Sequence, residues 1–174
     1  MLLSENKYKE PDYLLLSQED NIEIRQYNQY IVAKTSKFID TSESENNMFR
    51  ILASYIFGEN EKNQKIPMTA PVTTYQDNKS SYMLFYMLDS DSISELPNPS
   101  GQDILFEEFN LGKCAVISFS WFVNDKKINQ YQNKLEIFLR DNGYIPILPF
   151  MVNRYDPPWR LPFFRRNEVL VRIQ

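Results

Sequence analysis

The sequence predicts an α+β domain in which a β-β-α-β-β unit occurs twice, giving eight mainly antiparallel strands and two helices. Two observations support this pseudo-twofold fold class. Strand-like and helix-like segments follow one another in the same order in both halves of the chain. Equivalent strand positions are also 82 to 84 residues apart, as from Ile24 to Phe106 and from Val32 to Val116. The 174-residue length suits one domain with a sizeable core.

The domain boundaries follow from the same repeat. We expect residues 1–20 to be an N-terminal extension and residues 21–174 to form a single domain, with internal halves at about 21–90 and 103–174. The proline-rich stretch 96–101 is the strongest interruption in the chain and separates the two halves.

The first half opens with two strand patterns. Residues 22–27 alternate apolar and polar side chains, and residues 30–35 are rich in β-branched side chains, which predicts a β-hairpin. Apolar residues then recur at helical spacing. Thr41 or Ser42 is the expected N-cap of this helix, and Gly58 is expected to end it.

Proline shapes the next segment. Pro67 and Pro71 exclude a helix over residues 65–72 and favour an edge strand or an irregular strand that continues to Tyr75. Residues 82–88 are almost continuously apolar, which predicts a strand covered on both faces.

The second half repeats the order of the first. Residues 104–109 and 113–120 predict another hairpin, and Asp125 is the expected cap of a helix that runs to residue 142. Two further strands are expected at residues 147–155 and 167–173.

The composition excludes several classes of chemistry. The chain has no His, which removes His-based nucleophiles, His-liganded metals and haem held by an axial imidazole. A single cysteine, Cys114, allows no internal disulfide, favours a reducing compartment, and is expected to be a small buried apolar residue. With 19 basic and 23 acidic residues the net charge is −4, so we expect no nucleic-acid partner.

Targeting and catalytic signals are missing as well. The N-terminal residues lack the basic and apolar pattern of a signal peptide, and no apolar stretch is long enough to span a bilayer, so we expect a cytoplasmic protein with no membrane partner. Neighbouring carboxylates such as Glu107 and Glu108 point to opposite faces of a strand. We therefore expect no catalytic residue and no metal site, and a binding protein rather than an enzyme.

Two features leave alternatives open. Eleven Tyr, twelve Phe and two Trp either line a groove for a flat apolar ligand or simply fill a bulky core. The cluster Arg160, Arg165 and Arg166 either holds a carboxylate ligand or ties the last strand to nearby acidic groups.

Several segments taken together resemble the SOUL haem-binding family. They occur in the family's order and extend over residues 22–173. The segments are Ile22–Tyr27, Tyr30–Lys34, Tyr55–Asn60, Lys65–Val72, Tyr155–Pro158 and Arg165–Val169.

The resemblance implies a distorted eight-stranded barrel with two flanking helices. It also implies that haem or another tetrapyrrole binds in a shallow apolar groove beside the first helix. The apolar contacts expected on this basis are Met48, Phe49, Leu52 and Ile56, and Arg50 is expected to pair with a propionate. Met68 lies in the family's proline-containing segment, where it either contacts the ligand or only shapes the strand.

The absence of His limits how iron can be held. Some members of the family are proposed to use a His ligand, so in this chain iron would meet Tyr, Met or Cys, or no protein atom. The resemblance thus implies a protein that buffers or carries haem or porphyrin through apolar contact. The alternatives are a domain that binds a different small effector and an enzyme that modifies tetrapyrroles, and no protein partner is indicated.

Overall fold

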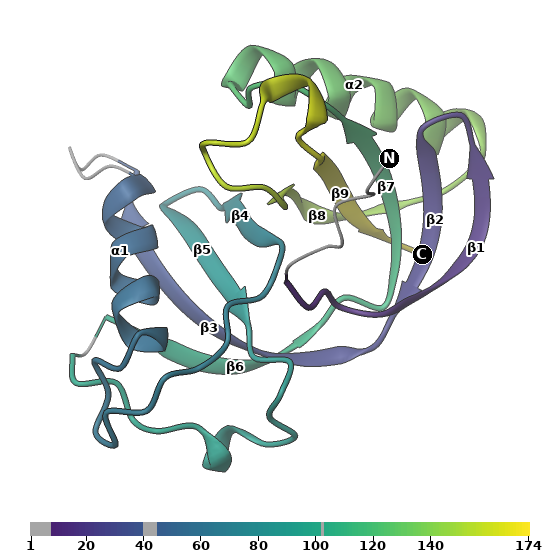
Figure 1. Ribbon diagram of the computed structural model, residues 1–174. Coiled ribbons are helices and arrows are strands. Elements are labelled where there is room, and N and C mark those ends of the chain that lie inside the picture. The colour runs from purple at the N-terminus through teal and green to yellow at the C-terminus, as the bar shows by residue number, and fades with distance from the viewer. Residues whose placement is uncertain (1–7, 40–44, 102) are drawn as a thin grey trace, which may run out of the picture.

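One curved, nine-stranded antiparallel sheet carries both helices on its outer side (Figure 1). The computed structural model describes residues 8–39, 45–101 and 103–174. The elements are β1 (Tyr13–Glu19), β2 (Ile22–Tyr27), β3 (Gln29–Phe38), α1 (Glu45–Ile56), β4 (Val72–Gln76), β5 (Ser80–Tyr86), the 3₁₀ turn η1 (Ile93–Glu95), β6 (Leu105–Asn110), β7 (Lys113–Phe119), α2 (Asp125–Asp141), β8 (Pro146–Arg154), the 3₁₀ turn η2 (Pro162–Phe164) and β9 (Asn167–Ile173).

The strand order confirms the pseudo-twofold α+β fold. It runs β1-β2-β7-β9-β8-β4-β5-β3-β6, so β8, β9, β7 and β2 on one side of the centre correspond to β4, β5, β3 and β6 on the other. The two halves meet where β4 pairs with β8, from Val72 opposite Arg154 to Tyr75 opposite Met151. The sheet curls like a distorted barrel but is not closed, because β1 and β6 are its two edges.

The two predicted hairpins are wrong, although their strands are present. β2 pairs with β7, and β3 pairs with β6. Each half of the sequence therefore contributes one strand to the part of the sheet built mainly by the other half. A single residue, Asn28, separates β2 from β3, which is too short for a hairpin turn of two residues. At the crossing, the Tyr27 N–H donates to the carbonyl of Gly112 over 2.8 Å. Alternation identifies a strand but does not identify the strand beside it.

A ninth strand lies in the segment expected to be an N-terminal extension. β1 pairs antiparallel with β2, from Tyr13 opposite Tyr27 to Glu19 opposite Ile22. All seven of its residues are exposed. Because neither face of β1 is buried, its sequence lacks the alternation that identified the other strands.

Two local predictions also need correction. Of the two alternatives for the proline segment, the edge strand is wrong, because β4 is central. Residues 65–71, which contain Pro67 and Pro71, are irregular and precede β4, so neither proline removes a hydrogen bond from the ladder. The N-cap of α2 is Asn124 rather than Asp125, since its side chain accepts a 2.9 Å hydrogen bond from the Lys127 N–H. The expected caps of α1, residues 41 and 42, lie outside the described residues.

Three apolar clusters hold the fold together. α1 buries Met48, Leu52 and Ile56 against β3 and β5, and α2 buries Leu135 and Leu139 against β7 and β9. The third cluster fills the inside of the curved sheet, where the alternate side chains of the same strands point. Its buried members are Tyr27, Val32, Leu84, Tyr86, Leu111, Cys114, Val116, Met151 and Leu170.

Shortening Leu52 tests the attachment of α1. Leu52 is 0% exposed, so Leu52→Ala leaves a cavity and is expected to lower the free energy of unfolding by about 2–5 kcal/mol. Phe57→Ala, just beyond the same helix, removes a side chain that is 63% exposed and should change the free energy of unfolding by no more than about 0.5 kcal/mol. Urea unfolding measures both, and equal losses would contradict this placement of α1.

Candidate functional site

The residues expected to contact a ligand divide into two sets on α1. Met48, Leu52 and Ile56 are fully buried and face the sheet. Phe49 and Arg50 are exposed. The second set is open to a molecule that approaches the helix from solvent, and Met48 of the first set also lines the cleft between the two halves.

Phe49 belongs to an apolar stripe along one side of α1. Phe49, Ala53 and Phe57 follow at intervals of four residues, and the Phe57 N–H still bonds to the Ala53 carbonyl over 2.9 Å. Eight residues of helix span about 12 Å, with the small Ala53 between the two rings. Phe49 also makes an edge contact with Phe85 of β5, which fixes its ring.

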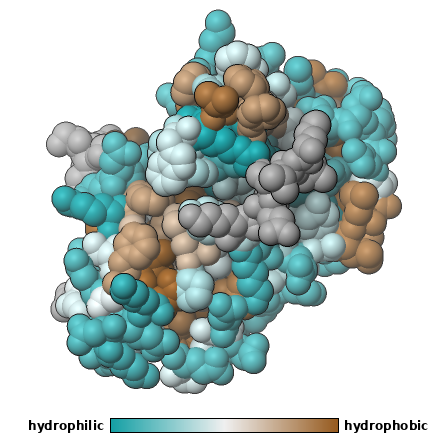
Figure 2. Space-filling model, viewed as in Figure 1, coloured by the Kyte–Doolittle hydropathy of each residue, from teal (hydrophilic) through white to brown (hydrophobic). Residues whose placement is uncertain are grey.

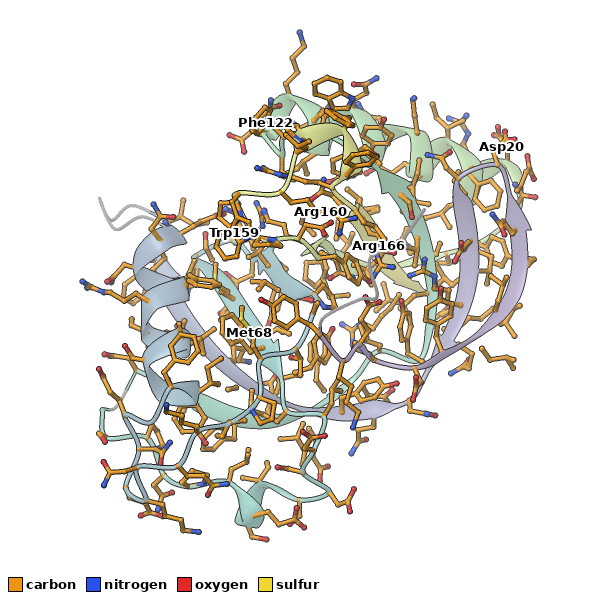
Figure 3. The ribbon with its side chains drawn as sticks, viewed as in Figure 1. Asp20, Met68, Phe122, Trp159, Arg160 and Arg166 are labelled. Atoms are coloured by element: carbon orange, nitrogen blue, oxygen red, sulfur yellow. The ribbon has the colours of Figure 1, made fainter. Side chains whose placement is uncertain are left out.

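The segment that leads into β4 lies beside this stripe. Ile66 and Met68 are partly buried against the same core as α1, and the Ile66 N–H bonds to the Ile56 carbonyl over 2.8 Å. Figure 3 places Met68 beside α1, and Figure 2 shows apolar side chains gathered over this part of the surface. The surface formed by Phe49, Ala53, Phe57, Ile66 and Met68 is called the α1 flank below.

Sequence reasoning missed Ala53 and Phe57. The signal was available, because 49, 53 and 57 repeat the spacing of 48, 52 and 56 one residue later, which is about 100° around a helix. The first stripe is buried and the second borders it. Arg50 follows Phe49 on the exposed side of α1, where its guanidinium donates to the Asn47 side chain over 2.7 Å. It also lines a small pocket with Glu59 and Asp103, next to the flank.

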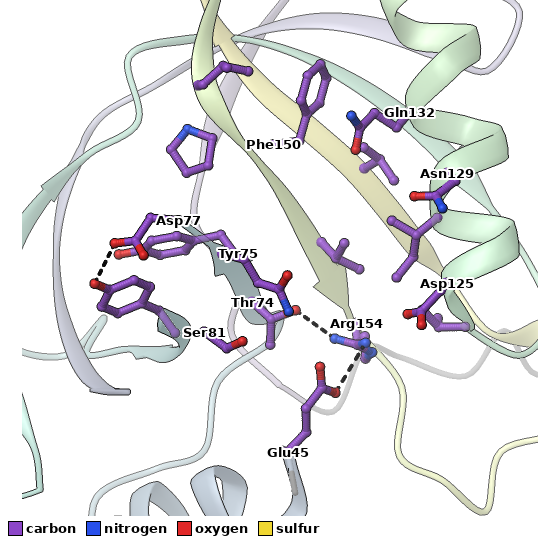
Figure 4. A pocket seen from close by; sticks show the side chains of 18 of the residues that line it. Glu45, Thr74, Tyr75, Asp77, Ser81, Asp125, Asn129, Gln132, Phe150 and Arg154 are labelled. Atoms are coloured by element: carbon purple, nitrogen blue, oxygen red, sulfur yellow. Dashed lines mark hydrogen bonds and ion pairs between the residues drawn. The ribbon is translucent and has the colours of Figure 1, made fainter. Parts of the chain in front are cut away.

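A larger cleft lies between the two halves of the molecule (Figure 4). Its volume is about 1030 Å³, and β4 and β8 contribute to its walls together with both helices. Charged side chains reach it from Glu45, Asp77, Asp125 and Arg154. Because these come from elements far apart in sequence, no local motif predicted the cleft.

The cleft carries an excess of negative charge. Arg154 is already engaged, since it donates to Thr74 over 2.8 Å and lies 3.5 Å from a Glu45 carboxylate oxygen. Hydrogen bonds from the Lys79 N–H, the Tyr82 hydroxyl and the Ser80 N–H lower the pKa of Asp77, which keeps it ionised. An anionic ligand therefore meets repulsion there.

A buried polar network occupies the inside of the sheet. Arg25 of β2 pairs with Glu168 of β9 over 2.9 Å, and both side chains are almost fully buried. Glu168 also accepts from the Tyr155 hydroxyl over 2.7 Å and from the Asn153 amide over 3.2 Å. Burial raises the pKa of Tyr155, so its hydroxyl keeps its proton and donates to Glu168. Because these buried side chains bond to one another, we interpret the network as stabilising the fold rather than as binding a ligand.

The arginines near the C-terminus are also engaged within the protein. Arg160 pairs with Asp156, Arg166 pairs with Glu10, and Arg165 donates to the Arg160 carbonyl over 2.8 Å. These contacts support the structural interpretation of the cluster. The acidic residue of the last strand, Glu168, pairs with Arg25 of β2.

Cys114 lies in the same interior. It is 0% exposed, and burial raises the pKa of its thiol to about 12. The expectation of a small buried apolar residue is confirmed. Its sulfur is sealed inside the sheet and cannot reach a molecule on the α1 flank.

Solved structures of very different sequence have a similar fold. The C-terminal domain of EcmrR superposes with a TM-score of 0.68 at 12% identity, covering 88% of this chain and 96% of that domain. A hydrolase from Listeria innocua superposes with a TM-score of 0.63 at 7% identity, covering 91% of this chain and 94% of the other. At such low identity these likenesses show the fold alone.

Comparison of the sequence with known families identifies the family of this chain. The model of the SOUL heme-binding protein family matches residues 8–172, and the chain belongs to that family. It is 30% identical to human Heme-binding protein 2 over 160 residues, which is 87% of this chain and 78% of that protein. It is 31% identical to mouse Heme-binding protein 2 over 128 residues, which is 70% of this chain but 62% of the mouse protein.

Breaking the buried ion pair should be costly. Arg25→Met leaves Glu168 charged and buried, so we expect the free energy of unfolding to fall by about 3–5 kcal/mol. Arg140→Met removes an exposed pair with Asp141 and should cost less than about 1 kcal/mol. Urea unfolding distinguishes the two, and a small loss for Arg25→Met would refute a structural role for the network.

The thiol of Cys114 should be unreactive in the folded protein. Burial excludes reagent, and the raised pKa keeps the thiolate fraction about a thousandfold below that of a free cysteine near pH 8. Ellman's reagent should therefore release colour only after urea is added. Rapid release from the folded protein would show that the interior opens.

Proposed function

We propose that the chain binds haem or a related tetrapyrrole on the α1 flank, without histidine, and so buffers or carries it. Membership of the SOUL family and the names of the human and mouse relatives support the ligand class. The observation that carries the location is the pair of exposed rings, Phe49 and Phe57, on either side of the buried Ala53 and beside the partly buried Met68. It is an apolar surface on the helix where the resemblance implied a groove.

The proposed site residues take different roles. Phe49 and Met68 contact the macrocycle directly, and Phe57 adds a second ring. Met48, Leu52 and Ile56 are buried against the sheet, so they hold the helix that presents the flank. Arg50 at the edge of the flank pairs with a propionate, because a guanidinium matches a carboxylate with two parallel hydrogen bonds.

Charge favours the flank over the larger cleft. Haem carries two propionates, and the cleft presents Glu45, Asp77 and Asp125 against one arginine that is already paired. The flank presents Arg50 instead. A dianionic ligand is therefore drawn to α1 and repelled from the space between the halves.

The donors available for iron are few. Of the cysteine, methionine and tyrosine donors that the absence of His leaves open, Cys114 is sealed in the interior, whereas Met68 borders the flank. We propose that iron is coordinated by the Met68 thioether or by no protein atom. In either case most of the affinity comes from apolar area and from the propionate pair, so a metal-free porphyrin should also bind.

Titration with hemin and with protoporphyrin IX tests the proposal. Phe49→Ala and Phe57→Ala each remove an aromatic contact, for which we expect about tenfold to a hundredfold weaker binding of both ligands. Ile137→Ala on α2, also exposed, is the matched control and should leave the dissociation constant unchanged. The Soret band and tryptophan quenching are the readouts.

A second variant separates iron ligation from apolar contact. Met68→Leu keeps the apolar volume and removes the thioether, so a weaker affinity for hemin alone would assign Met68 as the ligand. Equal affinity for both molecules would assign binding without coordination. Full affinity in the Phe49→Ala and Phe57→Ala variants, with circular dichroism unchanged, would refute a site on the flank.

A further inference from the structure

A group of large apolar side chains is exposed on two loops at one end of the molecule. The loops are residues 120–124, which follow β7, and residues 155–166, which join β8 to β9. Each of these side chains is at least half exposed, and that of Trp159 is 80% exposed. The aromatic patch consists of Trp121, Phe122, Trp159, Leu161, Phe163 and Phe164. Figure 3 labels Phe122 and Trp159 on these loops.

The loops are bonded to each other and to the sheet. The Trp121 N–H donates to the Pro162 carbonyl over 2.9 Å, and the Asn167 side chain donates to the Trp121 carbonyl over 3.0 Å. Rings also contact across the loops, since Trp121 and Phe163 lie 6.4 Å apart and Phe163 and Phe164 lie 4.5 Å apart. These contacts fix the part of the patch formed by Trp121, Phe163 and Phe164.

The backbone of Trp121 adopts a conformation that is unfavourable for a residue with a bulky side chain. Its φ angle is +81°, in the left-handed region that a bulky side chain rarely occupies. Such a conformation persists only where the surrounding contacts impose it. In this position the indole lies on the surface, where Trp121 is 53% exposed.

Basic side chains lie among the rings. The Lys127 ammonium is 5.9 Å from the Trp121 ring centroid, and the Arg165 guanidinium is 4.9 Å from that of Phe122. Lys126 is exposed on the first turn of α2. These three cations outnumber the neighbouring exposed carboxylate of Asp125, so the surface among the rings is basic on a chain whose net charge is −4.

We propose that the aromatic patch docks the protein on an anionic lipid surface. Trp and Phe rings favour the boundary between acyl chains and headgroups, and neighbouring Lys and Arg side chains attract acidic headgroups. None of the helices that the structure describes is long and apolar enough to span a membrane. The docking is therefore peripheral and uses loops. The expectation of no membrane partner rested on the length of apolar segments, which does not test this mode of binding. This inference is independent of the proposed tetrapyrrole site.

The two tryptophans of the chain make the test direct. Both Trp121 and Trp159 belong to the patch, so intrinsic emission reports on it without a label. The full chain, without tetrapyrrole, is mixed with vesicles of phosphatidylcholine alone or with about 30% phosphatidylserine. We expect a blue shift, quenching by brominated acyl chains and co-flotation with the anionic vesicles. Salt at about 0.5 M should weaken the binding.

Two double variants keep both tryptophans. Phe163→Ser with Phe164→Ser should weaken vesicle binding at least tenfold, and Lys126→Gln with Lys127→Gln should weaken it on anionic vesicles only. Leu14→Ser with Leu15→Ser on β1 removes exposed apolar side chains elsewhere and should leave binding unchanged. Circular dichroism checks that each variant folds.

Three results would overturn the proposal. The first is an unshifted emission spectrum with anionic vesicles, and the second is equal vesicle binding by the Phe163→Ser, Phe164→Ser variant. The third is a protein partner that binds the patch of a chain that ignores vesicles. Loss of tetrapyrrole binding has no bearing on these outcomes, because no tetrapyrrole is present.

Discussion

The ion pair of Arg25 with Glu168 is the constraint on which the rest of the structure depends. It joins β2 to β9 inside the sheet, and the network continues through Asn153 of β8, whose side chain accepts a 2.7 Å hydrogen bond from Thr73 of β4. The chain of polar contacts therefore reaches from one half of the molecule to the other. A slip of one residue at the junction of β4 and β8 would turn Thr73 or Asn153 to the opposite face and leave buried charges without partners. The network thus favours one register, and that register sets where both helices and the α1 flank lie.

The sequence predicts the kinds of elements better than their neighbours. Alternating, continuously apolar and helical patterns located both helices and eight of the strands, because each of these elements packs apolar side chains against at least one of the three clusters. The exchange of strands between the halves could not be predicted, because the alternation around Ile24 and around Val32 is the same whichever strand lies beside it. β1 has no buried face, so no pattern marked it. The candidate site shows the same limit, because apolar spacing on α1 does not distinguish Leu52, which faces the sheet, from Phe49, which faces solvent.

Without histidine, the proposed binding of a tetrapyrrole on the α1 flank draws its affinity from ring area along α1 and from one arginine beside it. In this proposed mode the affinity depends weakly on the metal. The ligand is then released without breaking a strong coordinate bond, which is why we propose buffering or transfer rather than permanent retention.

The exchange of β2 and β6 between the halves has a further consequence for the unity of the domain. If the chain were cut in the proline-rich stretch 96–101, the N-terminal fragment would retain β2 without β7, and the C-terminal fragment would retain β6 without β3. The N-terminal fragment would expose one unpaired edge of β2, which still pairs with β1, and the C-terminal fragment would leave β6 without a partner. A single half could satisfy its own strands only by trading them with a second copy, as a strand-swapped homodimer. The repeat is therefore a covalently linked, interlocked pair, in which neither half is an autonomous folding unit.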